Sequence, residues 1–463
     1  MNDQLFIGRK EELAYLEKAY ASQDFEFCVV YGRRRIGKTS LVVRFCEEKR
    51  AVYHMAQKGT EAVGLKKLSE AISDSLLQKA QMQFASFEKA LGYLAEVSEH
   101  ERLVFVIDEF PYFCSSIPNS MSVLQYAIDH TLKKTKLMII LTGSSVSFME
   151  QEVMGSKSPL YGRRTRTLKL NPFSLAETAL LCARSPIESV LVQAMTGGVP
   201  LYVQYFASKD PLWEAIREIW FLKTGLLYYE PQFLLSMETR NPEQYAQVMA
   251  LLAAGTTKPS QMADKLGVSS PHLAALLTTL QALGLVTREL PFGEKQAKKG
   301  VYQISDSLFA FYLRFVYPYL ALLEQGKPDG PLRILEQHMD QFVGKQFEKM
   351  CHIYFLQHTD RPIIAISLWW GFDMQNHQNE ELDLVAEDAD GVMIFAECKW
   401  RSTKVGLSDY ARLVQRSTIL QKGEQSEYWL FSKSGFTDEL RKARVATLVS
   451  VDQMVSATGP GSL

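Results

Sequence analysis

Eight consecutive residues near the amino terminus have the types and spacing that bind the phosphates of a nucleotide. Two glycines let backbone N–H groups approach the phosphates, a lysine places a positive charge on the β- and γ-phosphates, and a threonine hydroxyl binds Mg²⁺. An apolar run over 25–31 precedes them, and a helix expected from Ser40 to Lys49 follows. The sequence therefore predicts a P-loop of the pattern GxxxxGK[ST] that binds ATP and Mg²⁺. Its binding residues are Gly32, Arg33, Arg34, Arg35, Ile36, Gly37, Lys38, Thr39 and Ser40.

A second motif completes this predicted site. The apolar run 103–107 ends in Asp108 and Glu109. A carboxylate at the end of a buried strand can orient Mg²⁺, which we assign to Asp108 together with Thr39, and Glu109 can align the attacking water. The next apolar run ends in Thr142, Gly143 and Ser144. Either Thr142 or Ser144 senses the γ-phosphate, or this segment is only a polar strand end.

Arginines gather at two places whose roles the sequence leaves open. Arg163, Arg164 and Arg166 follow Gly162. Such a cluster forms surface ion pairs or supplies charge to a transition state, in the same chain or from a neighbouring subunit of a homo-oligomer, and we name Arg163 and Arg164 as catalytic candidates. The three arginines of the P-loop can contact protein or nucleic acid.

Acidic residues near the carboxyl terminus indicate a second chemistry. Asp383, Glu397 and Lys399 stand in the arrangement D…ExK, with Glu348 in a preceding helix. Asp383 and Glu397 can hold a second divalent metal that polarises a phosphodiester, while Lys399 stabilises charge or orients water. The alternative is a solvated hairpin. Against it, the residues around these charges are apolar, and charges embedded there need a partner or a metal.

The turn between the two acidic strands decides whether such a site can form. With a two-residue loop, Asp390–Gly391, Asp383 would face Cys398 and point away from Glu397, because successive side chains alternate between faces. With a three-residue loop, Ala389–Gly391, Asp383 faces Glu397. We predict an odd-length or bulged loop, with Gly391 in the left-handed conformation that glycine adopts at little cost. The Asp383 and Glu397 carboxylates are then expected to converge closely enough to share a metal, with Lys399 beside them.

Composition places these motifs in an ordinary globular protein. The chain has 463 residues, 47% of them hydrophobic and 22% charged, enough for roughly three domains. Its formal net charge is −1, so any nucleic-acid contact depends on local basic patches. None of the six cysteines forms a CxxC pair, which argues against zinc and a disulfide framework. We find no signal sequence or membrane span and expect a cytoplasmic protein without a membrane partner.

The expected elements divide the chain into four parts. Residues 1–174 alternate strands and helices and predict an α/β P-loop NTPase with a parallel sheet. Residues 175–238 form a helical lid. In 239–325, three helices precede a hairpin, the order of a winged helix, and its tip at 294–299 carries three lysines that suit phosphate contact or plain solvent. After a linker over 326–330, residues 331–463 form an α/β domain with a helix over 340–357 and strands over 363–369, 382–387, 392–399 and 428–432.

These segments resemble the archaeal-type ATPases, a branch of the AAA+/STAND P-loop proteins. Residues 6–13 are similar to the family's entry motif near the adenine, which implies that Arg9 lies at the nucleotide. Residues 161–164 and 171–173 also resemble family segments. Residues 197–200 resemble the STAND glycine–proline motif, which implies that Pro200 lies near the nucleotide in the lid. Many STAND members carry an arginine just past the sensor strand, and this chain has Gly143-Ser144-Ser145 there. Arg163 or Arg164 becomes the substitute.

The carboxyl-terminal half resembles the domain of unknown function often joined to these ATPases, which is itself similar to PD-(D/E)xK nucleases of restriction-endonuclease-like fold. The resemblance implies Glu348 in the first-helix position, Asp383, Glu397 and Lys399 in the core motif, and Gln415 in the following helix.

Two functions follow as expectations. In the first, an ATPase is coupled through the winged helix to a metal-dependent nuclease that acts on nucleic acid, with DNA as the expected partner. In the second, the chain is an ATP-dependent regulatory switch that binds DNA or a protein, and its nuclease-like domain is inactive. Intact Asp383, Glu397 and Lys399 favour the first.

Overall fold

The computed structural model describes residues 6–77, 81–208, 210–294, 300–373, 377–420 and 425–456. The chain divides into two units, Met1–Pro172 and Phe173–Leu463. Within the described ranges, no helix combines the length and the apolar character needed to cross a membrane.

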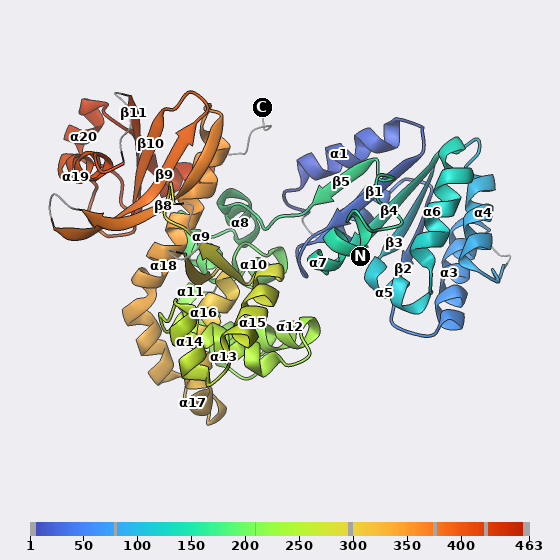
Figure 1. Ribbon diagram of the computed structural model, residues 1–463, viewed down its shortest axis with the longest axis horizontal. Helices are drawn as coiled ribbons and strands as arrows, with labels where there is room; N and C mark the ends of the chain where they lie inside the picture. Colours follow the sequence, from blue (N-terminus) through green and yellow to red (C-terminus); the bar gives the residue numbers. More distant parts are fainter. Residues whose placement is uncertain are drawn as a thin grey trace. The chain divides into compact units, whose positions relative to one another are not determined.

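The first unit is built on a five-stranded parallel sheet with the strand order β2-β3-β4-β1-β5 (Figure 1). Its central strands β1, β3 and β4 are mostly apolar and are buried along their whole length, as is usual in parallel sheets. The four strands expected from the sequence are confirmed, whereas the short, charged β5 was not foreseen. The strands are β1 Glu26–Tyr31, β2 Ala51–Met55, β3 Leu103–Asp108, β4 Leu137–Gly143 and β5 Arg166–Lys169.

Helices cover this sheet and complete its core. Alternate strand residues such as Phe27, Phe105 and Ile139 pack in one buried cluster with Leu68 and Leu91 from the helices. The helices are α1 Lys10–Ala21, α2 Lys38–Cys46, α3 Glu61–Leu76, α4 Phe87–Val97, α5 Phe110–Ser116, α6 Ser120–His130 and α7 Val146–Phe148, with the short turns η1 Leu132–Lys134 and η2 Met149–Val153.

The second unit begins with helices, as expected from residue 175. Two of them start with capping boxes, in which Ser174 pairs with Glu177 and Ser185 with Glu188. The helices are α8 Leu175–Cys182, α9 Pro186–Thr196, α10 Pro200–Gln204, α11 Leu212–Ile216 and α12 Glu230–Glu238, with the turn η3 Arg217–Phe221.

Three helices and a small antiparallel hairpin follow in the predicted order. Gly267 ends the second helix in the left-handed conformation, and Ser269 caps the third. The three lysines expected at the hairpin tip, within 294–299, lie outside the described residues. The elements are α13 Pro242–Ala253, α14 Pro259–Leu266, α15 Ser270–Ala282, β6 Val286–Glu289 and β7 Val301–Ile304.

The expected linker over 326–330 is shorter than predicted. Gly326, with positive φ, ends one helix, but Gly330 already lies in the first turn of the next. Pro331 explains this, because proline suits the first turn, where its missing N–H is not needed. The elements here are α16 Ser307–Phe315, η5 Tyr317–Tyr319, α17 Leu320–Glu324 and α18 Asp329–His358.

A mixed five-stranded sheet with the order β12-β11-β10-β9-β8 forms the carboxyl-terminal part (Figure 1). β8, β9 and β10 pair in antiparallel fashion, whereas β10, β11 and β12 are parallel. Phe355 of α18 packs on Trp429, whereas Leu413 of α19 shares a cluster with Phe395 and Leu430, so the two helices cover opposite faces. The elements are β8 Ile363–Asp373, β9 Gln378–Asp388, β10 Met393–Lys399, α19 Leu407–Ser417, β11 Ser426–Ser432, α20 Asp438–Ala443, β12 Thr447–Ser450 and α21 Val451–Ser456.

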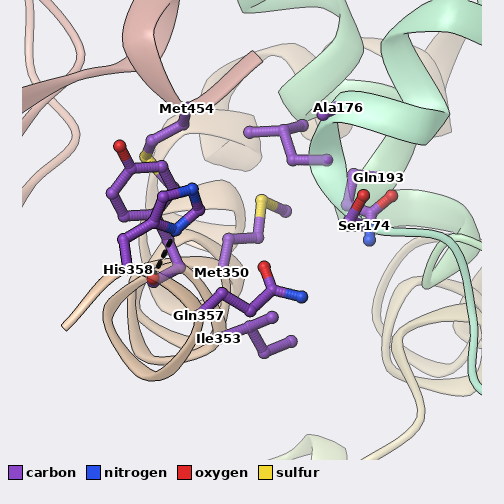
Figure 2. Close-up of a pocket in the computed structure, with 10 residues that line it drawn as sticks. Ser174, Ala176, Gln193, Met350, Ile353, Gln357, His358 and Met454 are labelled. Atoms are coloured by element: carbon purple, nitrogen blue, oxygen red, sulfur yellow. Dashed lines mark hydrogen bonds between the residues drawn. The ribbon is translucent and has the colours of Figure 1, made fainter. Parts of the chain in front are cut away.

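Both edges of this sheet, at β8 and at β12, are attached to the helical part of the unit. After β6, Phe292 enters the buried cluster of the sheet, and its N–H donates to Leu368 O at 2.8 Å. At the other edge, α21 packs on α8 and α9. Figure 2 shows the resulting crevice, where Met454 of α21 and His358 of α18 lie across from Gln193 of α9.

The β9–β10 turn has three residues, which confirms the predicted odd-length loop. Asp388 N donates to Val392 O at 3.1 Å, which leaves Ala389–Gly391 as the loop. Leu384 pairs with Ala396, so the register runs as predicted. Gly391 has φ +80°, the left-handed conformation expected for it.

Alanine substitutions at Gly391 and Gly330 test the left-handed loop position and the helical position assigned to these glycines, because they should change stability in opposite directions. A Cβ added at either glycine meets no atom within 4 Å, so backbone conformation alone decides the effect. We expect Gly391→Ala to lower the free energy of unfolding by about 1 kcal/mol, and Gly330→Ala, within a helix, to raise it by about 0.5–1 kcal/mol. Urea denaturation of both variants measures this, and effects of equal sign would contradict the loop assignment.

Candidate functional site

The P-loop has the backbone conformation that phosphate binding requires. Gly32 and Gly37 both have positive φ. A Cβ on Gly32 would lie 2.6 Å from the carbonyl oxygen of Leu170, so no other residue fits there. Gly37 precedes α2, and the first N–H groups of that helix lack partners within it. The loop and helix therefore offer a concentration of backbone donors to an anion.

Lys38 lies over this loop. Its side chain is buried, and its ammonium group donates to the carbonyl oxygens of Gly32 and Arg33, each at 3.0 Å. The charge is thus held at the mouth of the donor-rich loop, where the β- and γ-phosphates of ATP would lie.

The Asp108 carboxylate links the P-loop helix to the sheet. Its Oδ2 accepts from Thr39 Oγ1 at 2.9 Å and from the Tyr53 hydroxyl at 2.5 Å, and its Oδ1 accepts from Thr142. The structure thus brings Thr39 and Asp108 together, as predicted for Mg²⁺ binding. Tyr53 was not foreseen, because it lies 55 residues before Asp108 on β2. Burial and the Asp108 hydrogen bond raise the pKa of Tyr53, so its hydroxyl remains a donor.

Glu109 adopts a conformation that directs its carboxylate to β4. It has φ +57°, which is unfavourable for a residue other than glycine. Its N–H donates to Thr142 Oγ1 at 3.1 Å, and its carboxylate accepts from the hydroxyl and the N–H of Ser144. The two sensor candidates thus differ in the carboxylate that they contact: Thr142 donates to Asp108, and Ser144 donates to the carboxylate of Glu109, the residue assigned to the water.

Two arginines connect the P-loop to its surroundings: Arg9, from outside the loop, and Arg34, within it. The Arg9 guanidinium is buried and donates to Ile36 O at 3.2 Å and Asn171 O at 2.7 Å. Arg34 Nη2 donates to the Tyr112 hydroxyl at 3.1 Å. The contact to Ile36 gives Arg9 a means of positioning the P-loop.

The structure does not bring Arg163 to the P-loop of the same unit. Thr165 N donates to Phe27 O, near the start of β1, whereas the P-loop follows the end of that strand. Arg163 forms a two-pronged ion pair with Asp129 near the end of α6. Arg163 thus lies at the opposite edge of the sheet, which corrects its same-chain alternative.

Arg164 Nη1 instead donates to Met154 O at 3.4 Å, and its charge lowers the pKa of Tyr31 at the end of β1 against the larger effect of burial. The same-chain role of Arg164, and the neighbouring-subunit role of both arginines, stay predictions.

Pro200 lies in the second unit. It occupies the first position of α10, where its fixed φ suits a helix start. Its role toward the nucleotide stays a prediction.

A β-bulge places Asp383 in the second candidate site. Ser367 of β8 pairs with Val385 of β9, and Trp369 pairs with Leu382. Two β9 residues, Asp383 and Leu384, therefore lie opposite the single β8 residue Leu368. A bulge of this kind redirects a side chain and is common beside active sites. Asp383 Oδ2 accepts from Cys398 N at 2.7 Å, which brings its carboxylate to the strand that carries Glu397.

The Glu397 carboxylate is buried and half satisfied. Its side chain is 4% exposed, and its Oε1 accepts from Lys399 Nζ and, at 3.2 Å, from Arg416 Nη1. Its Oε2 is buried and has no hydrogen-bond partner in the described part of the chain. Arg416, from α19, was not foreseen, whereas its predicted neighbour Gln415 is exposed. An unpaired buried carboxylate oxygen is costly and suits a cation.

The acids of this site repel one another. Burial, and then the charges of Glu397 and Glu348, raise the pKa of Asp383 above its ordinary value. Burial is also the main cause that raises the pKa of Glu348, against the opposing effect of Lys345 at 3.3 Å. Across the described ranges, no three His, Cys, Asp or Glu side chains are grouped closely enough to hold a metal ion. The two carboxylates nevertheless offer the oxygen ligands that divalent cations such as Mg²⁺ prefer.

Comparisons with known proteins cover most of the chain. The family described as "ATPase domain predominantly from Archaea" matches residues 6–206, and "Archaea bacterial proteins of unknown function" matches 312–409. A protein of Methanocaldococcus jannaschii is 30% identical over 408 residues, which cover 86% of this chain and 88% of that protein. An ATP-binding protein of the same organism is 44% identical over 46 residues, 10% of this chain and 78% of that protein.

Among solved structures, a Walker-type ATPase of Pyrococcus abyssi matches with a TM-score of 0.52 and 21% identity, covering 67% of this chain and 97% of that chain. This likeness concerns the fold. Together with the P-loop geometry and the relative matched along 88% of its length, these findings show that the chain belongs to the archaeal-type P-loop ATPases that carry this carboxyl-terminal domain.

Proposed function

We propose that the chain hydrolyses ATP at the P-loop and couples this to metal-dependent cleavage of nucleic acid at the Asp383–Glu397 site. The observation that carries the second half is the bulge at Asp383, which brings a second carboxylate to the buried, half-satisfied Glu397.

For ATP hydrolysis, the residues have separate tasks. The P-loop N–H groups and Lys38 bind the phosphates, and Thr39 and Asp108 hold Mg²⁺, which neutralises charge on the β- and γ-phosphates. Glu109 aligns the attacking water. Because Ser144 donates two hydrogen bonds to Glu109, it fixes the carboxylate and is the better sensor candidate, while Thr142 holds Asp108.

For cleavage, Asp383 and Glu397 would hold a divalent metal that polarises the phosphodiester and lowers the pKa of water. Lys399 stabilises the charge that develops on the phosphate. Glu348, on α18 and close enough to raise the pKa of Asp383, accepts a proton or holds a water. The segment α13–β7 is proposed as the winged helix that binds DNA. Phe292 joins it to the sheet of the carboxylate site, which gives the two a fixed relation.

The alternative is an ATP-dependent binding switch whose nuclease-like domain is inactive. The ion pairs favour it, since Lys399 and Arg416 already neutralise Glu397 and Lys345 neutralises Glu348. Incubation with plasmid and linear DNA plus Mg²⁺ or Mn²⁺, with and without ATP, separates the two. Cleavage supports the nuclease, and ATP-dependent retention of intact DNA supports the switch.

Lys38→Ala and Glu109→Gln test the ATPase assignment. We expect the first to abolish ATP binding, because it removes the charge on the phosphates. The second should bind ATP normally but lower hydrolysis by at least ~100-fold, because the water loses its aligning carboxylate. A fluorescent ATP analogue and phosphate release measure the two steps, with the exposed Glu99→Gln as control. Wild-type turnover by Glu109→Gln would refute the assignment.

Tyr53→Phe tests the hydrogen bond on Asp108. Loss of one donor should leave the fold intact but raise the Mg²⁺ concentration for half-maximal ATPase activity by about 10-fold. Tyr93→Phe is the matched control, because Tyr93 is a partly buried tyrosine of the same unit that packs on its core and on Phe84. Equal Mg²⁺ dependence in the two variants would mean that Tyr53 only packs.

Glu397→Gln and Asp383→Asn test the carboxylate site. Each removes a metal-binding charge at constant size, so we expect cleavage to fall by at least ~100-fold while ATP hydrolysis stays near wild type. The exposed Glu336→Gln on α18 is the control. Cleavage that persists in both site variants would assign it to a contaminant or another site.

A further inference from the structure

A polar hollow lies beside the carboxylate site, between α19 and the paired ends of β8 and β9. Its lining offers charged and amide groups and little apolar surface. The lining residues are Asp373, Gln378, Asn379, Glu380, Arg412, Gln415 and Arg416.

Arg416 forms a common wall between this hollow and the carboxylate site. Its Nε lies 2.7 Å from Glu380 Oε2 in the hollow, and its Nη1 lies 3.2 Å from Glu397 Oε1. A nucleic-acid strand bound at Glu397 would therefore continue directly into the hollow.

Arg412 is the cation that the hollow leaves for a ligand. It lies one helical turn before Arg416, on the same face of α19. It is exposed, and within the described ranges it forms no hydrogen bond or ion pair. The two acids of the hollow do not neutralise the charge of Arg412. Glu380 is paired with Arg416, and Asp373 is buried, at 5% exposure, and already interacts with another group. Gln415 adds an exposed amide on the adjoining surface.

We propose that the hollow binds the backbone phosphate next to the cleaved phosphodiester, with Arg412 as its main ligand and Gln415 as a second donor. The guanidinium presents a planar pair of donors that matches phosphate oxygens. One helical turn between Arg412 and Arg416 also corresponds to the step between neighbouring phosphates of a strand. Arg416 is then a positioning residue that orients Glu397. The assignment rests on the proposed nuclease function and names its substrate contact.

The test measures binding of a fluorescent single-stranded DNA oligonucleotide to the full chain by anisotropy. EDTA is present, so neither cleavage nor metal binding enters the result. We expect Arg412→Ala to weaken binding by about 10-fold, the effect of one charge-assisted hydrogen bond, and to reduce the slope of log K against log salt by ~0.7. Arg412→Lys should restore the slope but only part of the affinity, because it keeps the charge and loses the planar fork.

Arg333→Ala is the matched control. Arg333 is an exposed arginine on α18, about 22 Å along that helix from Glu348 at 1.5 Å per residue. Wild-type binding with equal affinity and slope in Arg412→Ala and Arg333→Ala would overturn this inference and leave the nuclease proposal standing. No wild-type binding at any salt concentration would overturn both. Complete displacement of the oligonucleotide by inorganic phosphate at constant ionic strength would assign the hollow to free phosphate instead.

Discussion

The carboxylate of Asp108 is the point at which the parts of the nucleotide site meet. It accepts hydroxyl groups from Thr39 on α2, Tyr53 on β2 and Thr142 on β4. The strand order makes this possible. Because β4 lies between β1 and β3, the P-loop and Asp108 follow two strands separated by a single strand, whose own end supplies Thr142 and Ser144. Parallel strands end at the same edge, so residues far apart in sequence converge there.

The second unit obtains its site in another way. The register of β9 against β10 sets Asp383 opposite Glu397, and at the bulge against β8 the Asp383 carboxylate accepts from the N–H of Cys398, beside Glu397. The attachment of the sheet at both edges has an energetic consequence. Phe292 from the hairpin is part of the core of the sheet, and α21 packs on α8 and α9. Separating the carboxyl-terminal sheet from the helices would therefore expose apolar surface, which costs about 25 cal/mol of free energy per Å². The helical part and the sheet are therefore expected to move together.

The sequence predicted what depends on nearby residues. The P-loop, the strand before Asp108 and the loop at Gly391 are short patterns whose residue types restrict the backbone directly. What it missed depends on pairing between distant elements. The bulge requires the register of β8 against β9, Tyr53 requires that β2 be next to β3, and Arg416 requires that α19 lie across β10. The position of Arg163 followed the same rule, since only the pairing of β5 with β1 places it at the far edge.

The burial of the three acids is the strongest physical argument that the carboxylate site does more than hold the fold together. A carboxyl group whose pKa is raised by folding is harder to ionise in the folded state, so its contribution to stability falls as pH rises above its unfolded pKa. For Asp383 and Glu348, neutral pH is therefore on the unfavourable side. Lys345, Lys399 and Arg416 offset part of this cost, yet Glu397 Oε2 stays buried without a partner. Apolar residues of similar volume would pack here at lower cost, so the stability of the fold alone does not account for these acids, and this supports the proposed cation site.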